Sequence, residues 1–361
     1  MGKKVALLLV ILVVLAGISG VYIAGGLQAY ARDQQKNLAS QQHCGGQLPV
    51  HICVQSPREL FSAFYPSYLA THTPQFMVAY RSDTPITLII SISIAGFTQP
   101  EIQTINATDQ TQEFNALPLV QAQSLRKWTA DQTTQLQVRV TDTHNDLYYY
   151  NDIPLLVHSR WLMQWVAANR LKIAAWVTPQ DPSVAQLVLK AENYLPNQPM
   201  PAPNALIGYA NNASPRQVRD QVDAIFDAMR IDYHIRYVQG AVPYSGPGDT
   251  SISLEYIKLP GEVLQQHSGM CIELTALLAS AVERIGLHSE IVIIPGHAFL
   301  GVAVDPNNIH FEYWDAVDVN SGVAGDSANI SADKEYLQYQ KQLVDTIVIS
   351  DARQQGIEPM L

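Results

Sequence analysis

The sequence predicts an α+β protein made of an N-terminal membrane segment, a β-sandwich and a second domain in which helices accompany an antiparallel sheet. Three features support this prediction. The chain opens with an apolar run, residues 58–158 contain short alternating strands, and residues 206–361 mix helical patterns with strands. At roughly 150 residues per domain, a chain of 361 residues has room for about two domains.

The first 26 residues predict a membrane anchor or a signal segment. Lys3-Lys4 precede the uncharged run 5–26, which at about 1.5 Å per residue is long enough to cross a bilayer core of about 30 Å. The positive charges should stay cytoplasmic, so the bulk of the chain should lie outside a cell membrane that it crosses once. Residues 29–31, Ala-Tyr-Ala, form an alternative cleavage site, and cleavage would make the protein secreted.

Composition places the chain among folded proteins and argues against nucleic acid as a partner. Hydrophobic residues make up 47% of the chain and charged residues 15%, whereas disordered chains are poor in the former. The 22 Lys+Arg against 32 Asp+Glu give a formal net charge of −10. Because binding to phosphates needs stripes of Lys or Arg, no nucleic-acid partner is expected.

Two of the three cysteines predict a disulfide. Cys44 and Cys53 lie close together, and an exported protein meets the oxidising conditions in which disulfides persist. A metal site built from these two residues with His43 and His51 is the alternative, although the spacing fits no zinc pattern. Cys271 stands alone far downstream and is the expected free thiol.

Residues 58–158 predict a β-sandwich, plausibly immunoglobulin-like. Runs 75–81 and 86–94 are rich in β-branched and aromatic residues, run 136–141 alternates strictly, and run 147–156 continues the strand character. Residue types that carry catalysis do not gather there. A spacer role and a carbohydrate-contacting role are both consistent with this region.

Two less regular stretches flank the sandwich. Residues 27–57 are predicted to be a connector with the possible disulfide, and residues 159–205 a proline-rich linker with short helices. Ser214-Pro215 then predicts the start of a helix. Residues at helical spacing along this helix predict a core face rather than a cofactor site: Val218, Val222, Ile225, Phe226 and Met229.

Cys271 is predicted to lie in the first turn of a helix that Ser268 caps and Gly286 ends. Unpaired N–H groups and the helix dipole favour a thiolate at this position. A buried structural cysteine is the alternative. The predicted apolar face of this helix contains Leu274, Leu277, Leu278, Ala281, Val282 and Ile285.

The residues that follow complete a candidate catalytic set. His297 comes directly after a buried-type strand and a turn, and Asp315 ends a later strand. This order suits a thiol nucleophile, a general base and an orienting acid. Glu312 and Asp318 are alternative acids, and the alternative for His297 is a hydrogen-bonded histidine at a strand start. A side chain from residues 265–267 is a candidate oxyanion donor beside the Cys271 N–H.

The turn between the last two predicted strands decides whether Asp315 reaches His297. A one-residue slip between antiparallel strands reverses every side chain. A four-residue turn at 305–308 places Asp315 on the face opposite His297. A three-residue turn at 306–308, with Asn308 in the left-handed conformation, makes Asp315 a diagonal neighbour of His297 on the same face.

The stretch from Tyr233 to Asp315 resembles the transglutaminase-like superfamily of papain-type thiol enzymes. The matching motifs are Pro260-Gly261-Glu262-Val263-Leu264, Ser268-Gly269-Met270-Cys271, the helix to Gly286, and Pro295-Gly296-His297-Ala298-Phe299, with residues 344–359 similar to the closing strand. Two departures are a short interval between Cys271 and His297, and Ala316 in place of the Thr that commonly follows the acid.

This resemblance implies a papain/transglutaminase-like domain in residues 206–361, with the cysteine-bearing helix packed on an antiparallel sheet. It implies Cys271 as nucleophile, His297 as base and Asp315 as orienting acid. It implies no redox or nucleotide cofactor, and neither a catalytic metal site nor a Ca²⁺ loop is expected.

The predicted function is that of a membrane-anchored, extracytoplasmic thiol enzyme that acts on amide bonds of a protein or peptide substrate at the cell surface. A thioester intermediate would be resolved by water in a peptidase or amidase, or by an amine in a transglutaminase. The alternative is a catalytically inactive cell-surface interaction protein that uses the same fold and the β-sandwich for binding.

Overall fold

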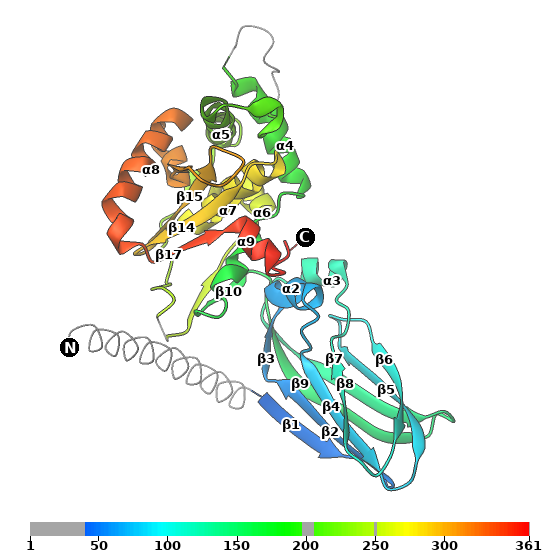
Figure 1. The fold of residues 1–361 in the computed structure, drawn as a ribbon. Helices are drawn as coiled ribbons and strands as arrows, with labels where there is room; N and C mark the ends of the chain where they lie inside the picture. Colours follow the sequence, from blue (N-terminus) through cyan, green and yellow to red (C-terminus); the bar gives the residue numbers. More distant parts are fainter. Residues whose placement is uncertain (1–39, 197–205, 249–250, 361) are drawn as a thin grey trace, which may run out of the picture.

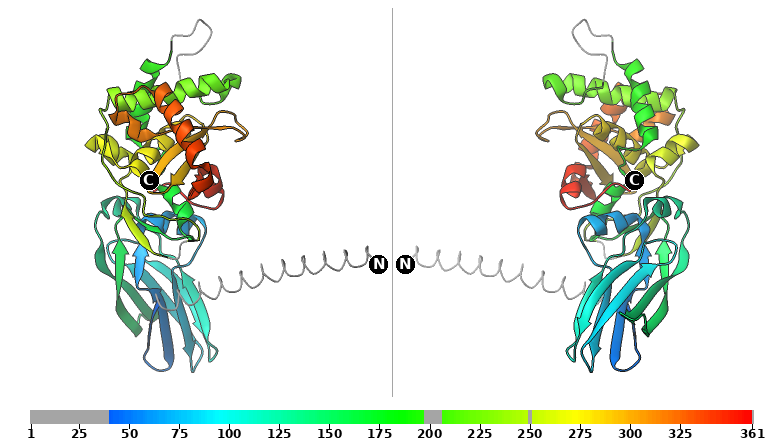
Figure 2. Two further views of the ribbon diagram at one scale, coloured as in Figure 1. Left: turned by 90° about the vertical axis from the view of Figure 1, so that its left-hand side faces the viewer. Right: turned by 90° about the vertical axis from the view of Figure 1, so that its right-hand side faces the viewer.

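The computed structural model describes residues 40–196, 206–248 and 251–360, and it shows mixed α and β structure with several sheets (Figure 1). This fits the predicted α+β class. A β-sandwich is followed by a part built from helices and a four-stranded sheet, and these two parts lie end to end (Figure 2). The predicted membrane segment, residues 1–26, lies outside the described residues. Within those residues, no helix has the length and apolar character needed to cross a membrane.

The sandwich consists of two sheets with strand orders β1-β2-β4-β7 and β3-β9-β8-β5-β6. The four runs predicted as strands correspond to β4, β5, β8 and β9. The strand bounds are β1 Ser40–Gly45, β2 Val50–Pro57, β3 Glu59–Phe61, β4 Phe76–Ser82, β5 Ile86–Ile94, β6 Glu101–Ala107, β7 Gln112–Ala116, β8 Gln132–Asp142 and β9 Leu147–His158. Three short helices accompany them: η1 Ser62–Phe64, α2 Tyr65–Ala70 and α3 Ala122–Lys127.

Strict alternation along the strands builds the sandwich core. In β2, Val50, Ile52 and Val54 are buried, and the residues between them are half-buried. Leu88 and Ile90 of β5 are buried in the same cluster from the opposite sheet. The alternation places one apolar face of each sheet against the other, as is typical of a sandwich.

Residues 40–57 differ from the predicted connector, because they form β1 and β2, and β2 pairs with β4. Strand β1 was not predicted because it lies at a sheet edge, has no buried side chain and shows no apolar alternation. Cys44 faces Cys53 across this hairpin, and the two form the predicted disulfide. The alternative metal site is excluded, since both sulfur atoms are consumed.

The second part has a four-stranded antiparallel sheet in the order β16-β15-β14-β17. Its bounds are β14 Ser289–Ile294, β15 His297–Ala303, β16 Phe311–Trp314 and β17 Asp345–Val348. Two small ribbons are β10 Leu162–Trp165 with β12 Ser253–Tyr256, and β11 Arg236–Tyr237 with β13 Ser268–Gly269. The helices are η2 Arg170–Trp176, α4 Pro182–Ala191, η3 Glu192–Tyr194, η4 Ala210–Asn212, α5 Pro215–Ile231, α6 Pro260–Gln266, α7 Cys271–Arg284, η5 Ala316–Asn320, α8 Gly325–Tyr339, η6 Gln340–Gln342 and α9 Ile349–Gln354.

Helices cover both faces of this sheet. Ile291 and Ile293 of β14 join the large core that contains α7. Val292, next to them in sequence, packs on the other face with Phe299 and with Tyr336 of α8. A strand buried on both faces explains why all six residues of β14 are buried and why residues 291–294 form a continuous apolar run rather than an alternating one.

Residues 159–205 were predicted to be a linker, and the described part of this stretch differs from that prediction. Trp165, Trp176, Val184 and Leu187 are fully buried in the core of the second part. The prolines suggested a linker, but Pro182 is the first residue of α4, a position where a missing N–H costs nothing.

The predicted helix at Ser214-Pro215 is confirmed as α5, with Ser214 and Gln217 forming a capping box. All five residues of its predicted core stripe are buried.

Candidate active site

Helix α7 begins at the candidate nucleophile, Cys271. The prediction that Ser268 caps this helix is wrong, because Ser268 belongs to β13 and the capping residue is Met270, which has extended backbone. The predicted end is confirmed, since Gly286 has a φ of +82° in the left-handed region. Cys271 therefore lies in the first turn, where N–H groups have no partner within the helix.

His297 is placed by a tight turn. It is the first residue of β15 and faces Ile294 of β14 across the two-residue connection Pro295-Gly296. Gly296 has a φ of +77°, which a residue without Cβ adopts at no steric cost. The imidazole thus projects from the end of a sheet rather than from a loop.

The register of β15 and β16 brings Asp315 to the same face as His297. Leu300 faces Trp314, which is the pairing that the three-residue turn predicts. Asn308 has the left-handed conformation required for that turn, with a φ of +57°. Of the two turns considered from the sequence, the structure has the one compatible with a triad.

Asp315 and His297 are hydrogen-bonded. The distance between His297 Nε2 and Asp315 Oδ2 is 2.9 Å, and the aspartate is 7% exposed. Its other oxygen accepts the N–H of Val317 at 3.1 Å. Both carboxylate oxygens therefore have partners, which fixes the orientation of the carboxylate and, through it, the imidazole.

The Cys271 side chain lies close to His297 and affects its pKa. Burial lowers the pKa of His297, but hydrogen bonds to Asp315 and to the Cys271 side chain, together with the negative charges of both groups, raise that pKa to about 10. With Nε2 occupied by Asp315, Nδ1 is the nitrogen left for the thiol. A histidine that lies between an acid and a cysteine is the arrangement that a thiol nucleophile needs.

Two buried contacts, which sequence reasoning missed, hold these residues in place. The Thr275 hydroxyl lies 2.8 Å from the carbonyl oxygen of Cys271 and 3.1 Å from that of Ala298. It thereby joins the cysteine helix to the histidine strand. Trp314, directly before the candidate acid, donates its indole N–H to Asp223 at 2.8 Å. The contacts of Thr275 with Ala298 and of Trp314 with Asp223 have no local signal in the sequence, because these partners lie 23 and 91 positions apart.

The alternative acids occupy different positions. Glu312 is paired with Arg219 on α5. Asp318 lies close enough to the pair for its pKa to be raised by burial and then by the charge of Asp315, but it makes no hydrogen bond to His297 among the contacts of the described residues. Asp315 is the acid that the structure joins to His297.

Two of the candidate oxyanion donors at 265–267 have hydrogen-bond partners other than Cys271. His267 donates Nδ1–H to a backbone carbonyl at 2.6 Å, and the Gln266 side-chain oxygen accepts from Lys258. All three residues are exposed. The backbone N–H of Cys271 is the donor that the first turn of α7 offers.

Glu335 of α8 is a further carboxylate beside the pair. One oxygen of Glu335, one of Asp315 and one ring nitrogen of His297 lie within 4.8 Å of one another, so these three are the described residues that could hold a metal ion. Burial raises the pKa of Glu335, and the charge of Asp315 raises it further. The sequence gives no signal for Glu335, because its approach depends on how α8 packs on the sheet.

No protein-family model matches this chain, and no curated protein sequence matches it either. The resemblance of residues 233–315 to transglutaminase-like enzymes stays a prediction from motifs. The functional argument therefore starts from the geometry of Cys271, His297 and Asp315.

Proposed function

We propose that the protein is a thiol enzyme that acts on amide bonds through a thioester intermediate, with Cys271 as nucleophile, His297 as base and Asp315 as orienting acid. The observation that carries this proposal is the position of His297, which is hydrogen-bonded to Asp315 at 2.9 Å and lies close enough to Cys271 for that side chain to raise its pKa. A nucleophile, a base and a group that orients the base are the parts such a reaction needs.

The chemistry follows from these positions. His297 takes the proton of Cys271, and the sulfur attacks the amide carbonyl to form a tetrahedral oxyanion near the Cys271 N–H. Collapse breaks the carbon–nitrogen bond, and His297 returns the proton to the leaving amine. Water or a second amine then attacks the thioester and frees Cys271. Attack by water makes the enzyme a peptidase or amidase, and attack by an amine makes it a transglutaminase.

The proposed place of action is outside the cytoplasm, on a protein or peptide substrate at the cell surface. The positions of Lys3 and Lys4 before the apolar run 5–26 support this placement, because positive charges beside a membrane segment stay on the cytoplasmic side. The disulfide between Cys44 and Cys53 agrees with an oxidising compartment. A reporter fused after Leu361 should be active only outside the cytoplasm, and cytoplasmic activity would contradict this placement.

A non-catalytic interaction protein is the second candidate, and the burial of the nucleophile favours it. Cys271 is only 1% exposed, as is usual for a structural cysteine. In this case the β-sandwich would supply the binding surface, and the hydrogen bond between His297 and Asp315 would only stabilise the fold. The two candidates differ in whether Cys271 is chemically reactive.

Alkylation by iodoacetamide distinguishes them. An ordinary thiol, with a pKa of about 8.5, barely reacts at about pH 5.5, whereas a thiolate paired with an imidazolium does. We expect alkylation of Cys271 at this pH to exceed that of the unfolded chain by at least about tenfold. His297→Gln should abolish the excess, and Cys271→Ser should abolish the labelling. A folded chain whose Cys271 reacts no faster than the unfolded one would support the interaction protein.

A further inference from the structure

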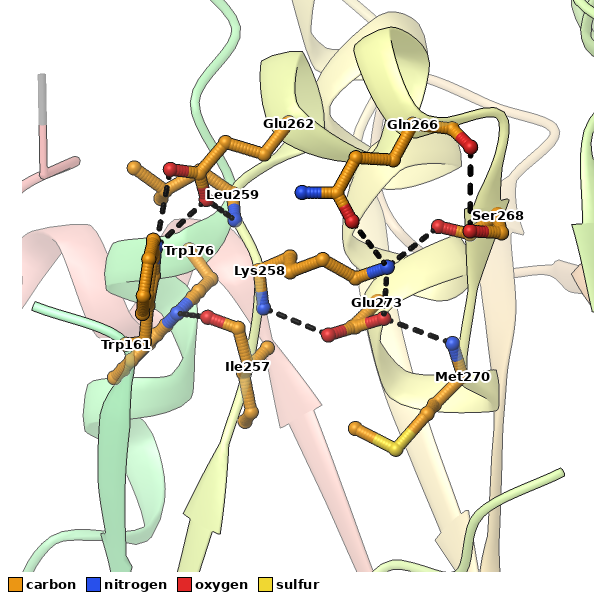
Figure 3. Close-up of polar contacts among 10 residues, drawn as sticks. All are labelled: Trp161, Trp176, Ile257, Lys258, Leu259, Glu262, Gln266, Ser268, Met270 and Glu273. Atoms are coloured by element: carbon orange, nitrogen blue, oxygen red, sulfur yellow. Dashed lines mark hydrogen bonds and ion pairs between the residues drawn. The ribbon is translucent and has the colours of Figure 1, made fainter. Parts of the chain in front are cut away.

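A buried carboxylate that the proposed reaction does not use holds the segment leading into Cys271 (Figure 3). The side chain of Glu273 is 2% exposed. Its Oε1 accepts the backbone N–H of Lys258 at 2.8 Å, and its Oε2 accepts that of Met270 at 2.9 Å. The carboxylate thus joins two backbone segments that lie on either side of α6.

The ammonium group of Lys258 completes this connection. Its Nζ lies 3.4 Å from Glu273 Oε2 and donates to the carbonyl of Ser268 at 2.7 Å. The Gln266 side-chain oxygen lies a further 3.4 Å from Nζ. Figure 3 shows the lysine extended between these acceptors, so the partly exposed ammonium group connects Glu273 to the segment before Cys271.

The opposite side of the segment is fixed by β11. Arg236 faces Ser268, and the N–H of Val238 donates to the Gly269 carbonyl at 2.9 Å. A Cβ atom at Gly269 would lie 2.8 Å from the end of the Leu274 side chain, so a larger residue at this position would require Leu274 to shift. The chain before Cys271 is therefore held from both sides.

The charge of Glu273 also acts on a neighbouring buried acid. Burial is the main reason why the pKa of Glu255 rises to about 7, and the negative charge of Glu273 adds to it, against a hydrogen bond from Trp165. Two buried carboxylates near each other cost stability. Glu273 therefore adds to the cost of burying Glu255, while its two backbone hydrogen bonds fix the segment before Cys271.

We infer that Glu273 and Lys258 are positioning residues for Cys271. The inference rests on the proposed function. By fixing Ser268, Gly269 and Met270, they direct the Cys271 thiol toward His297 and the Cys271 N–H toward the oxyanion. Removal of either partner leaves a buried donor or charge unpaired, which lets this segment shift. A misplacement of about 1 Å can cost as much as about 100-fold in rate.

The experiment measures iodoacetamide alkylation of Cys271 across a pH range. Glu273→Gln keeps the size of the side chain, but its amide can accept only one of the two N–H groups. We expect alkylation at about pH 5.5 to fall roughly tenfold in Glu273→Gln and about threefold in Lys258→Met, with the fold retained.

Glu262→Gln is the matched control. Glu262 caps α6 by accepting the N–H of Leu259 at 2.8 Å, as Glu273 caps α7, but it contacts Trp161 instead of residues 268–270. Its loss should lower the melting temperature and leave alkylation within about twofold. A purely structural role predicts the same small change in alkylation for both glutamates.

The outcomes separate the two proposals. Excess alkylation in the natural chain that depends on His297 but not on Glu273 or Lys258 would overturn the positioning role alone. Absence of any excess in the natural chain would overturn the proposed function. If Glu273→Gln does not fold, Lys258→Met decides, since it removes only the ammonium group, and an unchanged rate in that variant rejects the inference.

Discussion

The two parts of this molecule are held together by different means. The sandwich core is almost entirely apolar, and the one carboxylate buried in its strands, Asp142, accepts the N–H groups of His144 and Asp146 at a hairpin turn. Among its described residues, the second part buries four carboxylates, Glu255, Glu273, Glu290 and Asp315. A buried carboxylate costs free energy unless donors surround it. The larger number of buried carboxylates indicates that the second part, rather than the sandwich, carries destabilising buried charge, which is typical of functional sites.

The two parts nevertheless share a junction. Phe64 of η1 belongs to the large core of the second part and packs edge to face on Trp176, with ring centroids 6.5 Å apart. Lys172 lies over the Phe64 ring at 4.3 Å, and burial lowers its pKa to about 8. The Tyr256 hydroxyl also donates to Asp131, and the Glu358 N–H donates to the Ser67 hydroxyl, so a perturbation of one part can reach the other through these contacts.

Asp315→Asn should have the largest effect and should act on reactivity rather than on stability. The amide can still accept the N–H of Val317, but it removes the negative charge beside His297. An opposite charge at this distance shifts a pKa by about 1 to 3. We expect alkylation of Cys271 at acid pH to fall about 10-fold or more. Because the pKa of His297 falls, the change in alkylation rate that accompanies its deprotonation should move to lower pH.

Asp318→Asn is the matched control for this prediction. Asp318 is a half-buried acid three residues along the chain, and its charge interacts with the pair without a hydrogen bond to His297. The change should therefore alter the alkylation profile much less than Asp315→Asn does. Equal effects of the two variants would mean that Asp315 acts only as a nearby charge.

The sequence alone was sufficient to predict the elements and site residues whose environment is set by their neighbours along the chain. The alternation in β5 and β8, the helical stripe of α5 and the cysteine at the start of α7 are local patterns. The pairing of His297 with Asp315 could be predicted because one turn connects their strands. The sequence allowed two registers, and the left-handed conformation of Asn308 goes with the observed one. Strand β1 was missed because it lies at a sheet edge and has no buried side chain.

Thr275, Glu335 and Asp223 could not be predicted, for a different reason. Each contacts a residue from an element distant in sequence, and the contact exists only after the helices pack on the sheet. Ser268 was wrongly predicted to be a cap because Ser is a common capping residue. Here Glu273 satisfies the N–H of Met270 instead, and Ser268 pairs with β11.

Loss of the disulfide should affect the sandwich and spare the site. Cys44 and Cys53 are nine positions apart, and closing a loop of this size stabilises a fold by about 2 to 3 kcal/mol. Cys44→Ala with Cys53→Ala should lower the free energy of unfolding of the sandwich by about this amount in urea denaturation. Acid-pH alkylation of Cys271 should be unchanged. If alkylation of Cys271 fell along with the stability of the sandwich, the candidate site would depend on the sandwich, and the two parts would not be independent.

Glu255→Gln should have the smallest effect, and its sign depends on pH. The pKa of Glu255 is raised from 4.5 to about 7, first by burial and then by the charge of Glu273. A carboxyl whose pKa is higher in the folded state binds a proton there that the unfolded chain has already released. Its contribution to stability is therefore complete below about pH 4.5 and is lost as the pH rises to about 7. Gln does not titrate, so the variant does not lose this contribution.

The difference in unfolding free energy between Glu255→Gln and the natural chain should move in favour of the variant by about 1 to 3 kcal/mol between about pH 4.5 and pH 8. Glu113→Gln on the exposed side of β7 controls for the amide itself and should show the same difference at both pH values. A constant difference for Glu255→Gln would mean that the second part does not carry the cost of buried carboxylates that distinguishes it from the sandwich.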